Sequence, residues 1–272
     1  MRRIINYPPA RGTRVILGLL PFVLLVLVYV LASNARLAEL PNDKLMPSFA
    51  AMWKAMVRLA TQVDMATGER LLWWDTGLSL ARLGMGLGIS ALVGLVVGIL
   101  VGFIPHLRAA FEPFLAVLSL IPPLAVLPIL FIIFGLGEVS KIVLIVFGIA
   151  PFLIRDVALR VGDIPREQIV KAQTLGASTW DMIAWVVLPQ VLPRLIDSVR
   201  LSLGAAWLFV IAAEAIVSEG GLGYRIFLVR RYLAMDVILP YVAWITLLAF
   251  LMDLALRQIG RSAFPWTRLR EA

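Results

Sequence analysis

Six apolar stretches follow one another along the chain, and each is long enough to form a membrane-spanning helix. A helix needs about 20 mainly apolar residues to cross the hydrocarbon layer. The stretches are residues 15–33, 76–104, 113–134, 139–158, 199–218 and 237–256. Only Gly135-Leu136-Gly137-Glu138 separates the third from the fourth, which predicts a tight hairpin. The pattern therefore predicts an all-α membrane protein with about six transmembrane helices.

The first apolar stretch allows two interpretations. Four arginines precede it, and Ser33-Asn34-Ala35 at its end resembles a signal-peptidase site, as in a secretory signal. The apolar run of 19 residues is longer than the usual core of a signal peptide. We therefore expect residues 15–33 to be a retained transmembrane helix, with a cleaved signal as the alternative.

Composition supports the membrane assignment. Hydrophobic residues make up 61% of the chain and charged residues 15%, with a mean hydropathy of +0.94. Soluble domains contain about 45–50% apolar and about 25% charged residues, so a water-soluble fold is excluded. The net charge of +8 does not indicate nucleic-acid binding, because the basic residues lie in short segments between the apolar runs.

The chain has no cysteine, and His106 is its one histidine. A disulfide framework and a cysteine–metal site are therefore excluded, and zinc-dependent or histidine-dependent hydrolysis is a poor interpretation. The phosphate-binding pattern Gly-x-x-x-x-Gly-Lys-Ser/Thr is also absent. We expect no catalytic residue, no metal site and no bound cofactor in this chain, so any energy for transport must come from a partner.

The distribution of lysine and arginine predicts the orientation. If the N-terminus lies inside, the inner segments carry 15 basic residues and the outer segments carry nine, as expected for cytoplasmic and external loops. Segment 34–75 is too polar to cross the membrane, and Met52 to Leu59 reads as a short amphipathic helix outside it. The predicted parts are a cytoplasmic N-terminus (1–14), the first helix (15–33), a periplasmic segment (34–75), a core of five helices (76–256) that includes an inward loop (155–198), and a cytoplasmic C-terminus (257–272).

The inward loop 155–198 has the pattern of a helix–glycine–helix elbow. Asp163 is expected to cap the first helix, with Pro165 in its first turn, and Gly176 to end it. Ser178 to Asp181 is a capping-box pattern for the second helix. Pro189 and Pro193 are expected to interrupt the regular structure that follows. Ile169, Leu175 and Trp180 offer apolar contacts, although an ordinary loop would also fit the pattern.

The spacing of this elbow resembles a cytoplasmic motif of ABC importer permeases: Glu-Ala-Ala, three residues, Gly, nine residues, Ile-x-Leu-Pro. Ala172, Gly176, Val186 and Leu188-Pro189 match it, whereas Val170 and Lys171 replace the glutamate and the first alanine. In that family the loop is a coupling helix that docks into a groove of the ATP-hydrolysing subunit. The resemblance implies a set of coupling residues: Val170, Lys171, Ala172, Gly176, Ala177, Asp181, Val186, Leu188 and Pro189.

The resemblance extends over roughly 190 residues and is to the nitrate/sulfonate/taurine type of these permeases. It rests on motifs in matching order: Ile121 to Pro128, Phe134 to Lys141, Ala212-Ala213-Glu214, Gly221 to Tyr224, Asp253 with Arg257, and Pro265-Trp266. It implies the type I importer permease fold in a bacterial inner membrane. It also implies a second permease copy, two ATP-binding subunits that hold ATP and Mg, and a periplasmic solute-binding protein.

Several residues within the spans have both a functional and a structural interpretation. Pro122, Pro123 and Pro128 form either a broken helix that lines the translocation pathway or a packing kink. Glu214 is either a pathway residue or, as we slightly favour, a structural partner for a buried arginine such as Arg82. Asp253 and Arg257 are spaced for an ion pair. The small-residue ridge of Ser90, Gly94, Gly98 and Gly102 favours tight packing inside the subunit over a subunit interface.

Two alternatives to an importer permease are weaker. A stand-alone secondary transporter or channel often has an internal repeat, which this sequence lacks, and it would leave the elbow unexplained. An intramembrane enzyme would need a catalytic pair that the sequence does not supply. For the substrate, Asn42 to Leu45 and Arg230 to Asp236 look similar to permeases associated with urea carboxylase, which implies a guanidine-like or urea-like compound. Nitrate, a sulfonate or taurine is the alternative.

Overall fold

The computed structural model describes residues 10–40, 43–65 and 67–266, and all regular structure within them is helical. Predictions that concern residues 1–9, Pro41, Asn42 and residues 267–272 lie outside this description. The helices are α1 (Arg11–Glu39), α2 (Phe49–Thr61), α3 (Leu71–Phe103), α4 (Pro105–Leu118), α5 (Pro123–Phe134), α6 (Glu138–Gly162), α7 (Arg166–Thr174), α8 (Thr179–Met182), the π-helical turn η2 (Ile183–Val187), α9 (Leu188–Ile216), α10 (Leu222–Arg230) and α11 (Met235–Ala263). The prediction of an all-α membrane protein is confirmed.

Five of the six predicted spans are single long helices, namely α1, α3, α6, α9 and α11. The third is not, because α4 and α5 meet at an angle of 96°. Helix α4 ends at Leu118, and Pro122 and Pro123 follow within a few residues. Neither proline can donate a backbone hydrogen bond, and each restricts the residue before it, so one straight helix cannot pass through this point. The predicted third span, residues 113–134, is therefore bent where α4 meets α5, in agreement with the broken-helix interpretation of its prolines.

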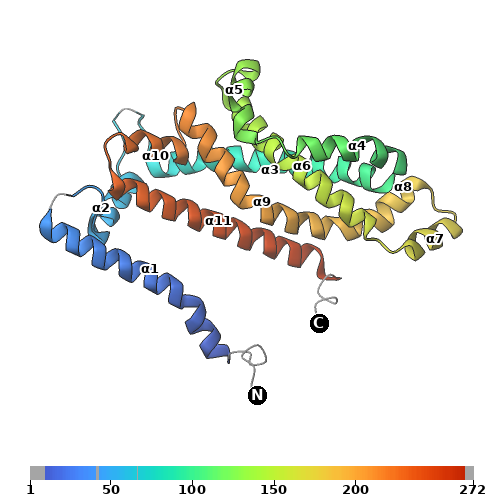
Figure 1. Ribbon diagram of the computed structural model, residues 1–272, viewed down its shortest axis with the longest axis horizontal. Helices are drawn as coiled ribbons and strands as arrows, with labels where there is room; N and C mark the ends of the chain where they lie inside the picture. Colours follow the sequence, from blue (N-terminus) through green and yellow to red (C-terminus); the bar gives the residue numbers. More distant parts are fainter. Residues whose placement is uncertain (1–9, 41–42, 66, 267–272) are drawn as a thin grey trace.

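Helix α6 lies at the centre of the bundle, between α3 and α9, and α11 packs against α9 (Figure 1). The residues of α6 that face these neighbours are apolar and fully buried, among them Leu144, Leu153 and Val157. Helices α7 and α8 extend from one end of this bundle, and α10 lies toward the other end. The short α2, predicted as Met52 to Leu59, is confirmed and packs against α11 and α3.

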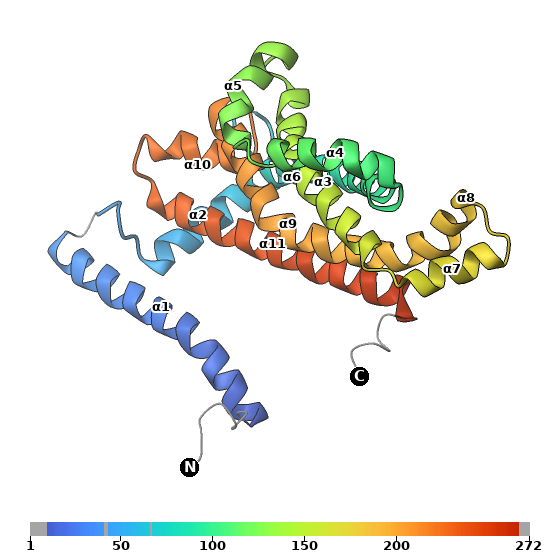
Figure 2. The same cartoon turned by 45° about the vertical axis from the view of Figure 1, so that its right-hand side comes forward.

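Helix α1 diverges from the other helices in both views (Figures 1 and 2). None of its most apolar 18-residue window is buried inside the structure. Its C-terminal half is held to the segment before α2 by hydrogen bonds and an ion pair. The Tyr29 hydroxyl donates to the Pro47 carbonyl (2.7 Å), the Ser33 hydroxyl donates to the Met46 carbonyl (3.0 Å), and Arg36 pairs with Asp43. The apolar surface of α1 therefore needs lipid or another chain as its partner.

The small-residue ridge of α3 packs against α6 within the subunit, as we favoured from the sequence. A Cβ atom added at Gly94 would lie 2.6 Å from the Leu153 Cβ, and one added at Gly102 would lie 2.9 Å from the Ala158 carbonyl oxygen. Real Cβ atoms do not approach so closely, so the two backbones are in direct contact. Small residues permit such close helix packing in a membrane, where lipid gives no hydrophobic force between helices.

This contact generates a prediction for Gly98, whose added Cβ would lie 2.7 Å from the Val157 Cβ and 2.9 Å from the Ile154 carbonyl oxygen. Gly98→Ala should force α3 and α6 apart and lower the melting temperature of the purified protein. Gly88→Ala is the matched control on the same helix, because its Cβ would meet nothing within 4 Å. The control should be neutral or should stabilise α3 by up to about 1 kcal/mol. Equal melting temperatures for the two variants would contradict the contact.

Candidate functional site

The elbow between α6 and α9 is built around a Schellman motif at the end of α7. The backbone N–H of Ala177 donates to the Ala172 carbonyl (3.1 Å), and that of Gly176 donates to the Gln173 carbonyl (3.0 Å). These bonds require a left-handed residue, and Gly176 supplies it with φ +83°. The sequence-based prediction that Gly176 ends the helix is confirmed. Ala172 and Ala177, both candidate coupling residues, are joined by the hydrogen bond that spans five residues.

The second helix of the elbow begins with the predicted capping box. The backbone N–H of Asp181 donates to the Ser178 hydroxyl oxygen (3.2 Å), and the backbone N–H of Ser178 donates to the Asp181 carboxylate (3.0 Å). Both ends of the turn are thus fixed by local hydrogen bonds. Asp181 therefore orients the chain after Gly176 through these local hydrogen bonds.

Three details of the elbow differ from the prediction. Asp163 ends α6 and does not cap α7, whose N-cap is Pro165 without a side-chain hydrogen bond. The restriction that a proline places on the residue before it keeps α7 from starting earlier. Residues 155–162 continue α6 and residues 188–198 begin α9, so the part of the predicted loop outside these two long helices is 163–187. Pro193 lies inside α9 without ending it, and only Pro189 marks an irregularity, the π turn η2.

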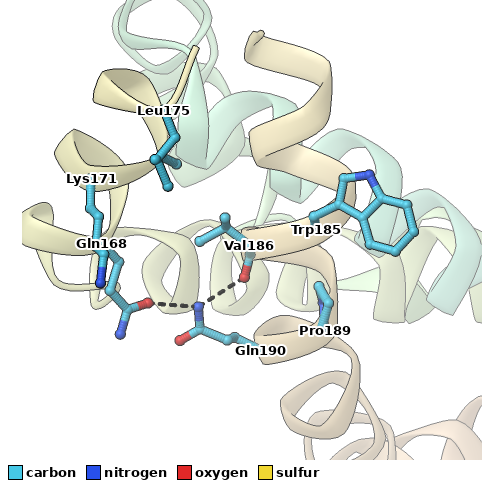
Figure 3. A pocket seen from close by; sticks show the side chains of 8 residues that line it. Gln168, Lys171, Leu175, Trp185, Val186, Pro189 and Gln190 are labelled. Carbon is cyan, nitrogen blue, oxygen red and sulfur yellow. Dashed lines mark hydrogen bonds between the residues drawn. The ribbon is translucent and has the colours of Figure 1, made fainter. Parts of the chain in front are cut away.

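A groove of about 380 Å³ lies between α7 and the start of α9 (Figure 3). Four candidate coupling residues line it, together with four residues that the sequence analysis did not select as sites: Lys171, Ala172, Val186 and Pro189, with Gln168, Leu175, Trp185 and Gln190. Leu175 and Trp185 are each 80% exposed, and Trp180 is 68% exposed. Leu175 and Trp180 are large apolar side chains exposed on the polar part of the elbow, which indicates a contact surface for another protein.

The remaining candidate coupling residues have different surroundings. Val170 is exposed and does not line the groove. Leu188 packs against the core of the bundle at the start of α9. Gln168 and Gln190, which are hydrogen-bonded to each other across 22 positions, were missed because nothing in the sequence shows that two glutamines so far apart are in contact. Trp185 has a signal, since it is a large aromatic residue within the motif spacing, but the sequence alone does not show that it is exposed.

A second group of polar residues is buried at the end of the bundle opposite the elbow. Asp75, Ser79 and Arg82 lie on one face of α3, and none is more than 3% exposed. Arg82 donates to both neighbouring helices: its Nη1 lies 2.6 Å from Glu214 Oε1 on α9, and its Nη2 lies 2.7 Å from Glu138 Oε1 on α6. Lys141 Nζ also donates to Glu138 Oε1 (2.8 Å).

This group also holds the loop between α9 and α10. Arg82 Nη1 donates to the Gly220 carbonyl (2.8 Å), and the backbone N–H of Gly223 donates to Glu214 Oε2 (2.8 Å). The backbone N–H of Gly221 donates to Asp75 Oδ1 (3.0 Å), and Arg225 Nε donates to Asp75 Oδ2 (2.8 Å). A Cβ at Gly221, which has φ +125°, would lie 2.5 Å from the Glu214 carboxylate, so only glycine fits there.

The charges in this cluster balance. Asp75, Glu138 and Glu214 are paired with Arg82, Lys141 and Arg225. Glu214 is fully buried, and the Ser79 hydroxyl also donates to its carboxylate (2.8 Å). The expected pairing of Glu214 with Arg82 is confirmed. In this structure Glu214 thus ties α9 to α3 and α10, and a pathway role for it stays a prediction.

The other span residues singled out from the sequence have the following positions. Pro122 is the N-cap of α5, Pro123 occupies its first turn, and Pro128 lies inside it. The break before Pro122 agrees with the broken-helix interpretation, and a pathway role stays a prediction. Asp253 pairs with Arg200 of α9, not with Arg257: Arg200 Nε lies 2.8 Å from Oδ1 and Nη2 lies 3.1 Å from Oδ2. The two-pronged geometry of an arginine facing a carboxylate explains this preference.

We predict that Glu214→Gln lowers the stability of the purified protein by about 3 kcal/mol, because it leaves buried donors of Arg82 without their charged partner. Combining it with Arg82→Met should cost less than the sum of the two single changes, since the residues share one network. Thermal unfolding in detergent measures both effects. Glu219→Gln, at an exposed position in the following loop, is the control and should be neutral. A transport defect in Glu214→Gln with unchanged melting would instead assign Glu214 to the pathway.

Comparison with known proteins places these features in a family. Residues 92–264 match the family of the binding-protein-dependent transport system inner membrane component. The chain is 36% identical over 198 residues to the taurine transport system permease protein TauC of Escherichia coli (strain K12), covering 73% of this chain and 72% of that one. It is 31% identical over 189 residues to the putative aliphatic sulfonates transport permease protein SsuC of Bacillus subtilis (strain 168), covering 70% and 68%.

The fold is also that of a solved importer. A chain of the inward-facing MetNI methionine ABC transporter superimposes with a TM-score of 0.61 at 23% identity, covering 79% of this chain and 99% of that one. The elbow, the spans and the sequence similarity thus agree, and the chain belongs to the family of binding-protein-dependent transport system inner membrane components, as an ABC importer permease of the nitrate/sulfonate/taurine type.

Proposed function

We propose that this permease forms the translocation pathway together with a second copy of itself, and that its elbow takes the work of ATP hydrolysis from two separate ATP-binding subunits. A periplasmic solute-binding protein delivers the solute to the opposite face. ATP and Mg are held by the partner subunits, because this sequence has no phosphate-binding loop. Both termini and the elbow lie in the cytoplasm, and the segment before α3 lies in the periplasm.

The observation that carries this proposal is the construction of the elbow. Helix α7 has no buried residue, yet its two ends are defined by a proline and by a Schellman motif. A segment that is ordered but buries none of its residues fully against its own chain is suited to pack against another one. The exposed Leu175 and Trp180 give that contact an apolar centre, as in most protein interfaces.

The path of the chain supports a lever mechanism. Helix α6 leads into the elbow and α9 leads out of it, and both continue to the buried charge cluster at the far end. Closure of the ATP-binding subunits would move the elbow, and α6 and α9 would carry this movement across the membrane as rigid rods. The permease would then alternate between inward-open and outward-open forms, and Pro122, Pro123, Pro128 and Glu214 are the pathway candidates in this scheme.

The docking role is tested by co-purification with the ATP-binding subunit. Leu175→Glu and Trp180→Glu should each abolish or strongly weaken association, because each places a charge in the apolar centre of the contact. Leu136→Glu is the matched control: Leu136 is 62% exposed, and it lies in the α5–α6 hairpin, away from the elbow. Deletion of residues 165–182 should also prevent association. Undiminished association of both point variants would reject the docking role.

For the substrate, we propose a small polar nitrogen compound of the guanidine or urea kind. The support is the similarity of the segments around Asp43 and Arg231 to permeases associated with urea carboxylase. A sulfonate such as taurine is the second candidate, because the curated relatives TauC and SsuC are named for taurine and aliphatic sulfonates.

Calorimetry on the companion solute-binding protein separates the two candidates. Guanidine or urea should bind with a measurable dissociation constant, and taurine and nitrate should not. Tight binding of taurine without affinity for guanidine or urea would reject the nitrogen compound as the substrate and favour a sulfonate. The choice of substrate leaves the proposed role of the elbow unchanged, since the coupling contact lies at the other face.

A further inference from the structure

Helix α7 must be connected mechanically to the spanning helices if it is to pass movement on to them. None of the α7 residues is fully buried, and only Ile169 and Ala172 are half-buried, so apolar packing fixes this helix to the bundle weakly. Two short connections lead to α6 and to α8. A push on α7 would bend these connections unless another contact carries the force to a spanning helix.

One side-chain contact has the required position. The side-chain nitrogen Nε2 of Gln190, in the first turn of α9, donates to Oε1 of Gln168 on α7 (2.9 Å) (Figure 3). The same nitrogen donates to the Val186 carbonyl oxygen (2.8 Å). Both N–H bonds of the amide are thus used, which fixes its orientation. Gln190 is half-buried, whereas Gln168 is exposed.

The backbone around Gln190 has a local cause. Pro189 has no N–H, so an ordinary α-helical turn would lack one hydrogen bond at this position. The chain forms the π turn η2 directly before it, with the Leu188 N–H bonded to the Ile183 carbonyl. A π turn holds one extra residue, which shifts the angular positions of the residues beyond it by about 100° relative to an uninterrupted helix. The π turn therefore sets the direction in which Gln190 faces, and in this structure it faces α7.

We propose that Gln168 and Gln190 are positioning residues whose hydrogen bond transmits movement of the elbow to α9. This inference rests on the proposed function, because it requires a partner that moves the elbow. The bond joins the helix that receives the movement to the helix that crosses the membrane. The Gln190 amide also binds the Val186 carbonyl of the π turn, so α7, the π turn and α9 are connected through one side chain. Loss of the bond leaves α7 able to dock but poorly able to move α9.

The test measures transport per ATP hydrolysed in proteoliposomes. They contain this permease, its ATP-binding subunits and the companion binding protein, with radiolabelled guanidine or taurine according to which that protein binds. Gln168→Ala and Gln190→Ala should each lower the ratio about five-fold, the effect of one neutral hydrogen bond, with association and ATP hydrolysis retained. The double variant should be no worse than either single variant, because each change removes the same bond.

Two further variants separate a specific link from a general disturbance. Gln173→Ala, on the exposed surface of α7, is the matched control and should transport as the unchanged protein does. Gln168→Glu with Gln190→Lys replaces the hydrogen bond by an ion pair and should restore the ratio, whereas a residue needed only for stability would not be rescued in this way.

Each of the other results has a definite meaning. Normal ratios in both single variants, or a double variant that shows the product of the two single effects, would overturn the link. Loss of association in the single variants would also overturn it, by placing the glutamines in the docking contact itself. Failure of the unchanged permease to associate with any ATP-binding subunit would reject the proposed function and not this inference alone.

Discussion

The direct contact between the backbones of α3 and α6 is the constraint on which the rest of the structure depends. Glycines at Gly94, Gly98 and Gly102 let α6 approach so closely that no side chain fits between the two helices. Toward the other end of this helix pair, beyond the contact of Gly86 with Ile145, Arg82 of α3 reaches Glu138 of α6. A longer distance between α3 and α6 would leave the buried guanidinium of Arg82 without its partner on α6, which is costly where no water is present. Close packing and charge pairing therefore require each other.

The two ends of the bundle differ in how firmly they are held. At one end, three carboxylates and three basic groups tie α3, α6, α9 and α10 together with matched charges. At the other end, α7 is ordered by its own caps and contacts the bundle through few side chains. An elbow that is loosely connected to a firmly packed bundle is suited to receive movement from a partner subunit. The distribution of contacts thus agrees with an importer driven from the elbow.

Much of this arrangement could be predicted from the sequence, because membrane helices and helix caps depend on local signals. The apolar runs gave five of the spans, and Gly176 and the Ser178–Asp181 pattern gave the elbow. What failed depended on choices between similar local options. Asp163 was a plausible cap, but α6 continues to Gly162 and Pro165 sets the start of α7. Arg257 was well spaced for Asp253, but Arg200 offers a two-pronged contact across helices.

The elbow also shows which motif positions the fold itself requires. Gly176 adopts the left-handed conformation of the Schellman motif, so a change at this position would alter the backbone. Ala172 contributes to the motif only through its backbone carbonyl, which any residue would supply. Pro189 lies next to the π turn that directs Gln190. By contrast, Val170 and Lys171 are exposed on α7 and contribute to no cap. Apart from the conservative Val186, the chain departs from the family motif only at these two exposed positions, where a different side chain changes the surface of the elbow and leaves its backbone intact.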